Sequence, residues 1–106
     1  MIETNERGGK QSKIKGKMTE IPPLALIEVS KVMALGLENY PREADGTPNW
    51  HKINCNSNLD HSLEHVANYL VEQNKPNRNK KEMREELSHY AARGFMALEQ
   101  FLREEF

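Results

Sequence analysis

Apolar residues recur at every third or fourth position in three stretches of this chain, a spacing that places them along one face of an α-helix. The pattern predicts helices over about 23–39, 57–73 and 79–104. Because helices joined by short connections pack as neighbours, we expect the apolar stripes to form the core of an antiparallel bundle. The stripes are Leu26, Val29, Met33, Leu37 and Tyr40; Leu59, Leu63, Val66 and Leu70; and Met83, Leu87, Ala91, Gly94, Leu98 and Phe101.

Prolines and small polar residues mark the ends of these helices. Pro22 and Pro23 fit a helix start, because the N–H that proline lacks would have no partner in the first turn. Pro41 ends the first helix, because it removes a hydrogen-bond donor and restricts the residue before it. Ser57 or Asn58 can cap the second helix. A long loop therefore follows the first helix, and a short break at 74–79 follows the second.

The long loop, residues 41–58, carries the only tryptophan of the chain, Trp50. Loops of this length in compact domains are usually either binding elements or disordered. Asn49, His51 and Lys52 flank the tryptophan, and this set of side chains can stack on a ligand and hydrogen-bond to it. We therefore predict a ligand-facing loop. The alternative is that Trp50 plugs the open end of the bundle and contacts no ligand.

The composition allows only a small core. A chain of 106 residues, 37% hydrophobic and 29% charged, corresponds to one domain that is polar for its size. Tyr69, Val71 and Met96 lie off the main stripes, so more than one face of a helix is apolar, and a symmetric assembly would bury those faces. We predict an all-α fold, a small three-helix antiparallel bundle with a long loop between helices 1 and 2, completed by homo-oligomerisation.

The first 20 residues differ from the rest because they are basic and contain little apolar surface. We predict a flexible basic arm over 1–20 and a single helical domain over 21–106. The arm is either a solvated terminus or a segment that folds over an anionic ligand. Its basic residues are Arg7, Lys10, Lys13, Lys15 and Lys17.

Cysteine content, apolar runs and net charge exclude several classes of protein. Cys55 is the only cysteine, so an internal disulfide framework and a cysteine-based zinc site within one chain are excluded. No apolar run approaches the roughly 20 residues that span a bilayer. The net charge of −1 produces no field that would attract nucleic acid. We expect a soluble cytoplasmic protein without a membrane partner, and binding to nucleic acid is the weakest alternative.

Polar residues form a ridge on the second helix and another on the third, each expected to lie opposite the core. His61 and His65 are four residues apart and can chelate a metal through neutral imidazoles. Since neither an HExxH pattern nor a third ligand accompanies them, a surface or interface pair is the favoured interpretation. The ridges are His61, His65, Asn68 and Glu72, and Glu82, Glu85, Glu86, His89 and Arg93.

Carboxylates on the same helices raise the alternative of a magnesium site, because magnesium prefers oxygen ligands and phosphate substrates. Glu82 and Glu85 make an ExxE step. All-helical nucleoside triphosphate pyrophosphohydrolases pair such a step with an ExxD step on the next helix, and that second half is missing. Asp60 and Glu64 are spaced by four and do not replace it. A pyrophosphohydrolase here would use Glu72 together with the ExxE step.

An ordered set of short motifs resembles a known family. The set is IPPLALIEVSKVMALGLENY from Ile21, the pair Asn49–Trp50, His65, and LSH at 87–89. It is similar to small phage proteins with a dATP/dGTP diphosphohydrolase amino-terminal-like domain, over about residues 9–102. The resemblance implies an all-helical, nucleotide-related protein. It also implies a characteristic set of residues: Gly36, Tyr40, Asn49, Trp50, His65 and His89.

Two departures from the family pattern bear on the chemistry. This chain has Glu64 where the family commonly has an arginine, and Ala92 where a second histidine follows the first in the last helix. Both changes weaken the case for hydrolysis, so the resemblance supports a purine nucleotide ligand more strongly than a reaction.

Two functions of different classes follow from the sequence. The first is a phage-type protein that binds a nucleotide or another phosphate-bearing small molecule without turnover, and so sequesters a host nucleotide signal. The second is a magnesium-dependent dATP/dGTP pyrophosphohydrolase in which His65 or His89 moves protons; only this second function requires a cofactor. The expected ligand-binding residues are Lys10, Lys13, Tyr40, Asn49, Trp50, Lys52, His65, His89 and Arg93.

Overall fold

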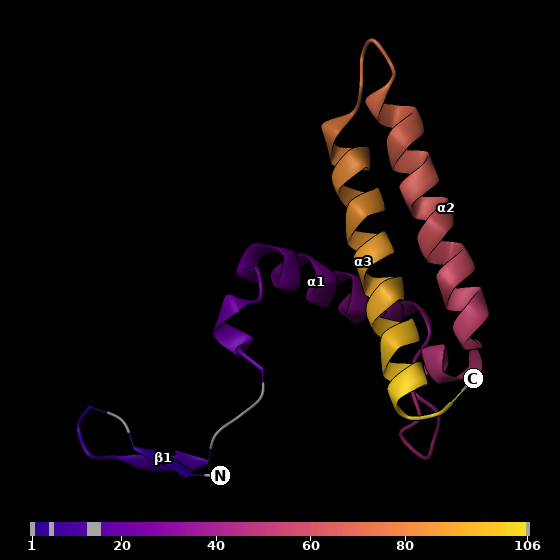
Figure 1. The fold of residues 1–106 in the computed structure, drawn as a ribbon. Helices are drawn as coiled ribbons and strands as arrows, with labels where there is room; N and C mark the ends of the chain where they lie inside the picture. Colours follow the sequence, from indigo (N-terminus) through magenta and orange to yellow (C-terminus); the bar gives the residue numbers. More distant parts are fainter. Residues whose placement is uncertain (1, 5, 13–15, 106) are drawn as a thin grey trace.

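Three α-helices dominate the computed structural model, which describes residues 2–4, 6–12 and 16–105. They are α1 (Pro23–Asn39), α2 (Cys55–Gln73) and α3 (Lys80–Leu102). Figure 1 shows α2 and α3 side by side as an antiparallel hairpin, and α1 crosses and contacts α3. The predicted all-α class and the long loop between α1 and α2 are confirmed.

Short elements complete the described chain. Two single-turn 3-10 helices, η1 (Met18–Glu20) and η2 (Asn49–Lys52), lie before α1 and in the long loop. Near the amino terminus, β1 (Ile2–Thr4) pairs antiparallel with β2 (Lys10–Ser12) in a two-stranded hairpin that the sequence analysis did not predict. Part of the basic arm therefore has regular structure.

Side-chain caps determine where α2 and α3 begin. The Oδ1 atom of Asn54 accepts a hydrogen bond from the N–H of Ser57 at 2.8 Å, so α2 begins two residues earlier than predicted. Asn79 caps α3 in the same way, accepting from the N–H groups of Lys81 and Glu82 at 3.0 and 3.2 Å. Each cap satisfies N–H groups that have no partner within the helix. The bounds of α1 are those predicted.

The predicted core is wrong for the single chain. Among the described residues, the buried hydrophobic side chains are only Val29, Ala92 and Ala97. The leucine stripes of α2 and α3 face outward instead, with Leu63 66% exposed and Phe101 59% exposed. Despite this exposed apolar surface, no helix in the described ranges combines the length and the hydropathy that a bilayer crossing requires.

Polar side chains fill the contact between α2 and α3. The Nδ2 atom of Asn58 donates to Oε1 of Gln100 at 2.8 Å, and both residues are buried. Ser62 donates to a main-chain carbonyl of α3 at 3.0 Å, and Ser88 is buried in α3 itself. Because buried polar groups are stable only when hydrogen-bonded, this contact depends on specific pairing. Residues of the polar ridges, which were predicted to lie opposite the core, also take part in this contact: His65 pairs with Glu86, and Arg93 donates to Asn58. This corrects their expected position.

Candidate functional site

A cavity of about 670 Å³ lies between the carboxyl-terminal half of α1, the loop that follows it, and α3. Its volume is within the range of roughly 300–1,000 Å³ that is typical of small-molecule sites. Residues from these segments, more than 50 positions apart in the chain, meet at its wall. The predicted site residues in its lining are Tyr40, Asn49, Trp50, His89 and Arg93.

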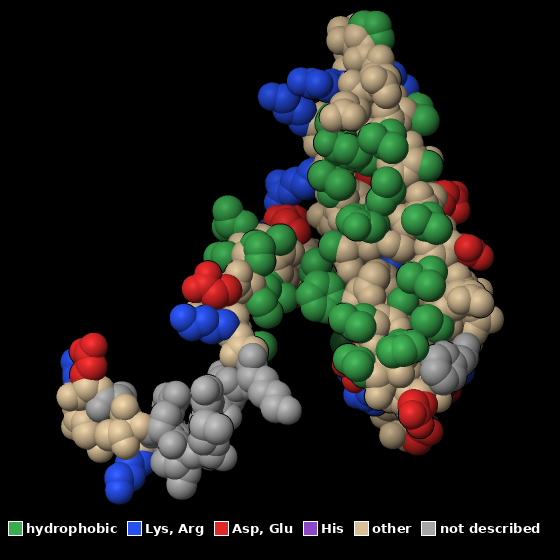
Figure 2. Space-filling model, viewed as in Figure 1, with side chains coloured by type: hydrophobic (Ala, Val, Ile, Leu, Met, Phe, Trp, Pro, Cys, Tyr) green, Lys and Arg blue, Asp and Glu red, His purple; other side chains and the backbone are tan. Residues whose placement is uncertain are grey.

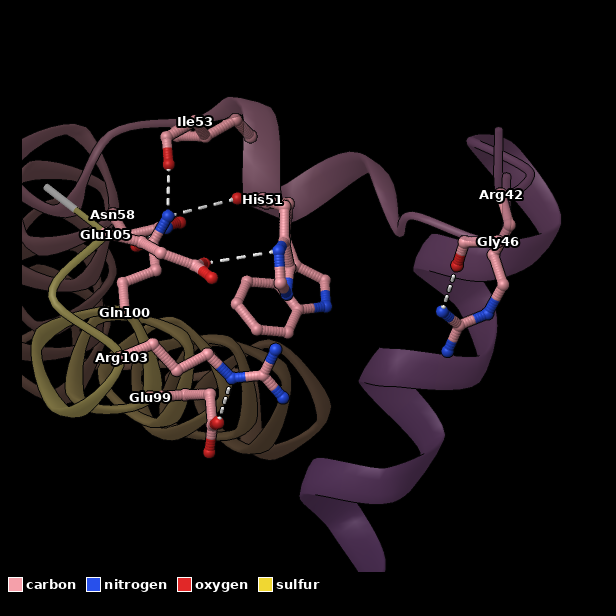
Figure 3. A network of polar contacts seen from close by, with 10 residues as sticks. Arg42, Gly46, His51, Ile53, Asn58, Glu99, Gln100, Arg103 and Glu105 are labelled. Carbon is pink, nitrogen blue, oxygen red and sulfur yellow. Dashed lines mark hydrogen bonds and ion pairs between the residues drawn. The ribbon is translucent and has the colours of Figure 1, made fainter. Parts of the chain in front are cut away.

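A chain of hydrogen bonds holds the Trp50 loop against the α2–α3 hairpin. The Nε2 atom of Gln100 donates to the carbonyl of Trp50 at 3.3 Å and to the carbonyl of Ile53, while its Oε1 atom accepts from Asn58 (Figure 3). Asn58 in turn accepts from Nη1 of Arg93 at 2.9 Å. Since Gln100 is only 1% exposed, these bonds are shielded from water. The loop is therefore anchored, and Trp50 lines one wall of the cavity.

Two arginines give the cavity a cationic character. Arg42 donates from Nη1 to the carbonyl of Gly46 at 2.8 Å, across a turn in which Gly46 has a φ of +89° (Figure 3). The hydrogen-bond partner of Arg93 among the described residues is the neutral amide of Asn58. The lining contributed by the described residues contains no carboxylate. Both guanidinium groups can therefore attract an anion into the cavity.

His89 of the cavity lining contacts His65, which in turn pairs with Glu86. The Nδ1 atom of His65 lies 2.8 Å from Oε2 of Glu86, and an ionised carboxylate only accepts, so the proton is on the histidine nitrogen. The rings of His65 and His89 are 5.1 Å apart between centroids. Burial, followed by the charge of the neighbouring His65, lowers the pKa of His89. His89 is therefore neutral at neutral pH and can donate or accept a hydrogen bond in the cavity.

The lowered pKa of His89 predicts a loss of stability in mild acid. Below the ordinary histidine value of 6.5, the unfolded chain takes up a proton at this position more readily than the folded chain does. The free energy of unfolding should therefore fall as the pH drops from 6.5 through the lowered value. Urea unfolding at pH 7.5 and 5.0 should show a smaller fall for His89→Gln than for the wild-type chain. Equal falls would contradict this role for His89.

The remaining predicted site residues lie elsewhere. Lys52, in η2, forms an ion pair with Glu43 and is not in the lining. His65 contacts the lining residue His89 and is not itself part of the lining. Lys10 lies in β2, outside the cavity, and Lys13 lies outside the described residues. The structure therefore brings together the aromatic and α3 residues of the predicted set, without the lysines.

The carboxylates proposed for magnesium do not fit a metal site. Both oxygens of Glu72 are already used: Oε1 accepts from the N–H of Asn79 at 2.7 Å, and Oε2 pairs with Nζ of Lys75 at 2.8 Å. These contacts, with Lys75 the stronger, lower the pKa of Glu72. Glu85 lines a separate hollow between α1 and α3. Within the described ranges, no three histidine, cysteine or acidic residues gather as a metal site would require.

Sequence reasoning missed one residue of the cavity and misjudged another. Arg42, which lines the cavity, was not singled out, because its position directly after Pro41 does not by itself indicate a binding residue. His61 was considered for metal binding with His65, but its side chain lines the cavity instead. Both residues add hydrogen-bonding capacity on the side where Arg93 and His89 already lie.

Fold and cavity together define a class: an all-helical protein with an aromatic and cationic cavity for a small molecule. Comparison with family models then identifies the family, because the model described as dATP/dGTP diphosphohydrolase, N-terminal, matches residues 5–106. The chain belongs to this family, as the ordered motifs had indicated. Comparisons with curated proteins and with solved structures found no match.

Proposed function

We propose that the cavity binds a purine nucleotide. The observation that carries this proposal is the composition of the lining, in which Tyr40 and Trp50 accompany Arg42 and Arg93 and no described carboxylate intervenes. A nucleotide has the matching chemistry, a flat aromatic base joined to an anionic phosphate. The family description, which names dATP and dGTP, supports the same class of ligand.

Each half of the ligand has a matching group in the cavity lining. Stacking of a base on an aromatic side chain contributes about 1 to 3 kcal/mol and tolerates different bases. Trp50 and Tyr40 provide such surfaces at the loop side of the cavity. Arginine forms two parallel hydrogen bonds to phosphate, and Arg93 lies with His89 on the α3 side. The proposed ligand therefore lies between the loop and α3.

Binding without turnover is the form of this function that the geometry supports best. The described carboxylates do not provide a magnesium site, because the oxygens of Glu72 are occupied by Lys75 and Asn79. A tight binder of this kind would sequester a nucleotide rather than consume it. We place this role in the cytoplasm, which suits the single free thiol of Cys55.

Trp50 provides a direct test, because it is the only tryptophan and its fluorescence reports on stacking. Titration with dGTP or dATP should quench the emission. By calorimetry, Trp50→Ala should weaken binding about tenfold to a hundredfold, the factor that corresponds to one lost stacking contact. Phe95→Ala, which removes an exposed aromatic side chain outside the lining, should leave binding unchanged.

The outcome of this test also separates the alternatives. Unfolding of Trp50→Ala, shown by a lost thermal transition, would indicate that Trp50 is a structural plug. No binding by the wild-type chain would overturn the proposed function. Mass spectrometry of the nucleotide after incubation with magnesium separates binding from hydrolysis: intact nucleotide indicates a binder, and released pyrophosphate indicates the hydrolase named by the family description.

Self-association is the remaining part of the proposal. Only three described hydrophobic residues are buried, so the single chain lacks the core that stabilises a domain of this size. A homo-oligomer would supply the missing contacts.

A further inference from the structure

One side of the α2–α3 hairpin carries a continuous set of exposed apolar side chains, which we name the hairpin face. Figure 2 shows hydrophobic side chains gathered over both helices on the viewed side. The members of the face are between 42% and 66% exposed. They are Leu59, Leu63 and Leu70 of α2 and Leu87, Tyr90, Leu98 and Phe101 of α3.

Helix geometry explains why both stripes lie on the same side. In α2, Asn58 and Ser62 contact α3. A stripe leucine comes one position after each of these contact residues, which places it about 100° further around the helix axis. In α3, Glu86 and Arg93 contact α2, and Leu87 follows Glu86 by the same single position. Because the helices are antiparallel, the same rotation from their contact leads to the same side of the hairpin.

We propose that a second copy of this chain covers the hairpin face, so that two α2–α3 hairpins form a four-helix bundle. Each of the two aromatic members can bury about 150 to 250 Å², and the five leucines are roughly half exposed, so the face is on the order of several hundred Å². A specific dimer buries about 800 Å² per partner. The face therefore supplies a large part of the area of a stable interface before any surrounding contacts are counted.

The shortage of internal core indicates a permanent partner. The three hydrophobic residues that are buried in the described part of the chain cannot offset the conformational entropy lost when three helices form. The face must therefore be covered whenever the chain is folded. A second copy is present wherever the chain is made, at a matching concentration, and obligate homodimers commonly have interfaces of this apolar kind.

Gly94 adds an argument from shape. It lies in the interior of α3 between Tyr90 and Leu98, where glycine costs about 1 kcal/mol relative to alanine. A Cβ atom placed there would meet no atom within 4 Å, so nothing inside the chain requires the glycine. A gap flanked by large apolar side chains is a hole that can receive a side chain from a facing helix. A side chain of a second hairpin that packs into this gap explains why glycine occupies the position.

The cavity would remain accessible in such a dimer. On α3 the cavity is lined by His89, Arg93 and Met96, whereas the hairpin face contains Leu87, Tyr90 and Leu98. The Arg84–Glu28 ion pair joins α3 to α1 away from the face. Assembly and ligand binding therefore use different sides of α3 and can be tested separately.

Sedimentation equilibrium of the full chain tests the proposal. The wild-type mass should be about twice 12.3 kDa, and the melting temperature should rise with protein concentration, as mass action requires for a dimer. Leu63→Glu should weaken self-association at least a hundredfold. Leu24→Glu is the matched control, because Leu24 is 78% exposed on α1, outside the face, and its replacement should leave the mass unchanged.

If Leu63→Glu does not fold, the dependence of the wild-type melting temperature on protein concentration still tests the proposal. A wild-type chain that is monomeric, with a cooperative melting transition independent of concentration, would overturn the proposal. An assembly that survives Leu63→Glu and dissociates with Leu24→Glu would also overturn it, because the interface would then involve α1. A monomer that folds only when a different polypeptide is added would assign the face to another partner.

Discussion

Replacing Arg93 with alanine is expected to weaken binding of dGTP about a hundredfold. A hydrogen bond to a charged group contributes about 1.5 to 3 kcal/mol, which corresponds to a factor of roughly 10 to 150 in affinity. Arg93 lines the cavity and donates to the buried Asn58, so its guanidinium is already oriented for a ligand. Isothermal titration calorimetry of the wild-type and Arg93→Ala chains measures the difference.

Two further variants show whether this effect belongs to the cavity. Arg103→Ala removes a cation from the end of α3, where it pairs with Glu99 outside the lining, and should leave affinity unchanged. Arg93→Lys keeps the charge without the forked geometry and should recover only part of the binding. An equal loss in Arg93→Ala and Arg103→Ala would show that overall charge, and not the cavity, attracts the ligand.

Replacing Gln100 with alanine is expected to lower the free energy of unfolding by about 3 kcal/mol or more. The change leaves the amide of Asn58 and the carbonyls of Trp50 and Ile53 without their partner, and each unsatisfied buried group costs about 1 to 3 kcal/mol. Urea unfolding followed by circular dichroism, with all chains at one concentration, measures this loss.

The matched control for this change is Gln73→Ala, which removes an exposed glutamine from the end of α2. Among the described residues its side chain makes one long hydrogen bond, at 3.5 Å to Tyr69, so the free energy of unfolding should change by less than about 0.5 kcal/mol. Equal effects of the two substitutions would contradict the role assigned to Gln100. Retained binding in a destabilised Gln100→Ala chain would separate the anchoring of the loop from its contact with ligand.

The helices could be predicted because their determinants are local. Pro23 and Pro41 bracket α1, whose observed bounds match those expected from the sequence. The start of α2 was misplaced by two residues because several adjacent polar residues can serve as a cap, and only the geometry shows that Asn54 does so. The amino-terminal hairpin was missed because β1 and β2 are only three residues long, too short for an alternating pattern.

The sides of the helices could not be assigned from periodicity. An apolar stripe indicates a face that avoids water, but it does not identify what covers that face. The stripe containing Leu63 was interpreted as the contact between neighbouring helices, whereas Asn58 and Gln100 make that contact. These two amides are 42 positions apart, and nothing in their local sequence indicates that they pair.

The candidate site was predictable where unusual residues carried the signal. Tyr40, at the end of α1, and Trp50, in η2, do line one cavity. Arg42 was overlooked because a single loop arginine is common on protein surfaces. Lys52 was included for its charge, but its pairing with Glu43 depends on how the loop turns back on itself.

The polar contact between α2 and α3 has a consequence for how this chain can vary. Leucines on the hairpin face can be exchanged for other large apolar residues at modest cost, since volume-conserving replacements are usually tolerated. Asn58 and Gln100 admit almost no replacement, because a new side chain would have to satisfy several fixed donors and acceptors at once. Over evolutionary time, substitutions should therefore accumulate among the leucines and avoid the two amides, the reverse of the pattern expected for a domain with an apolar interior.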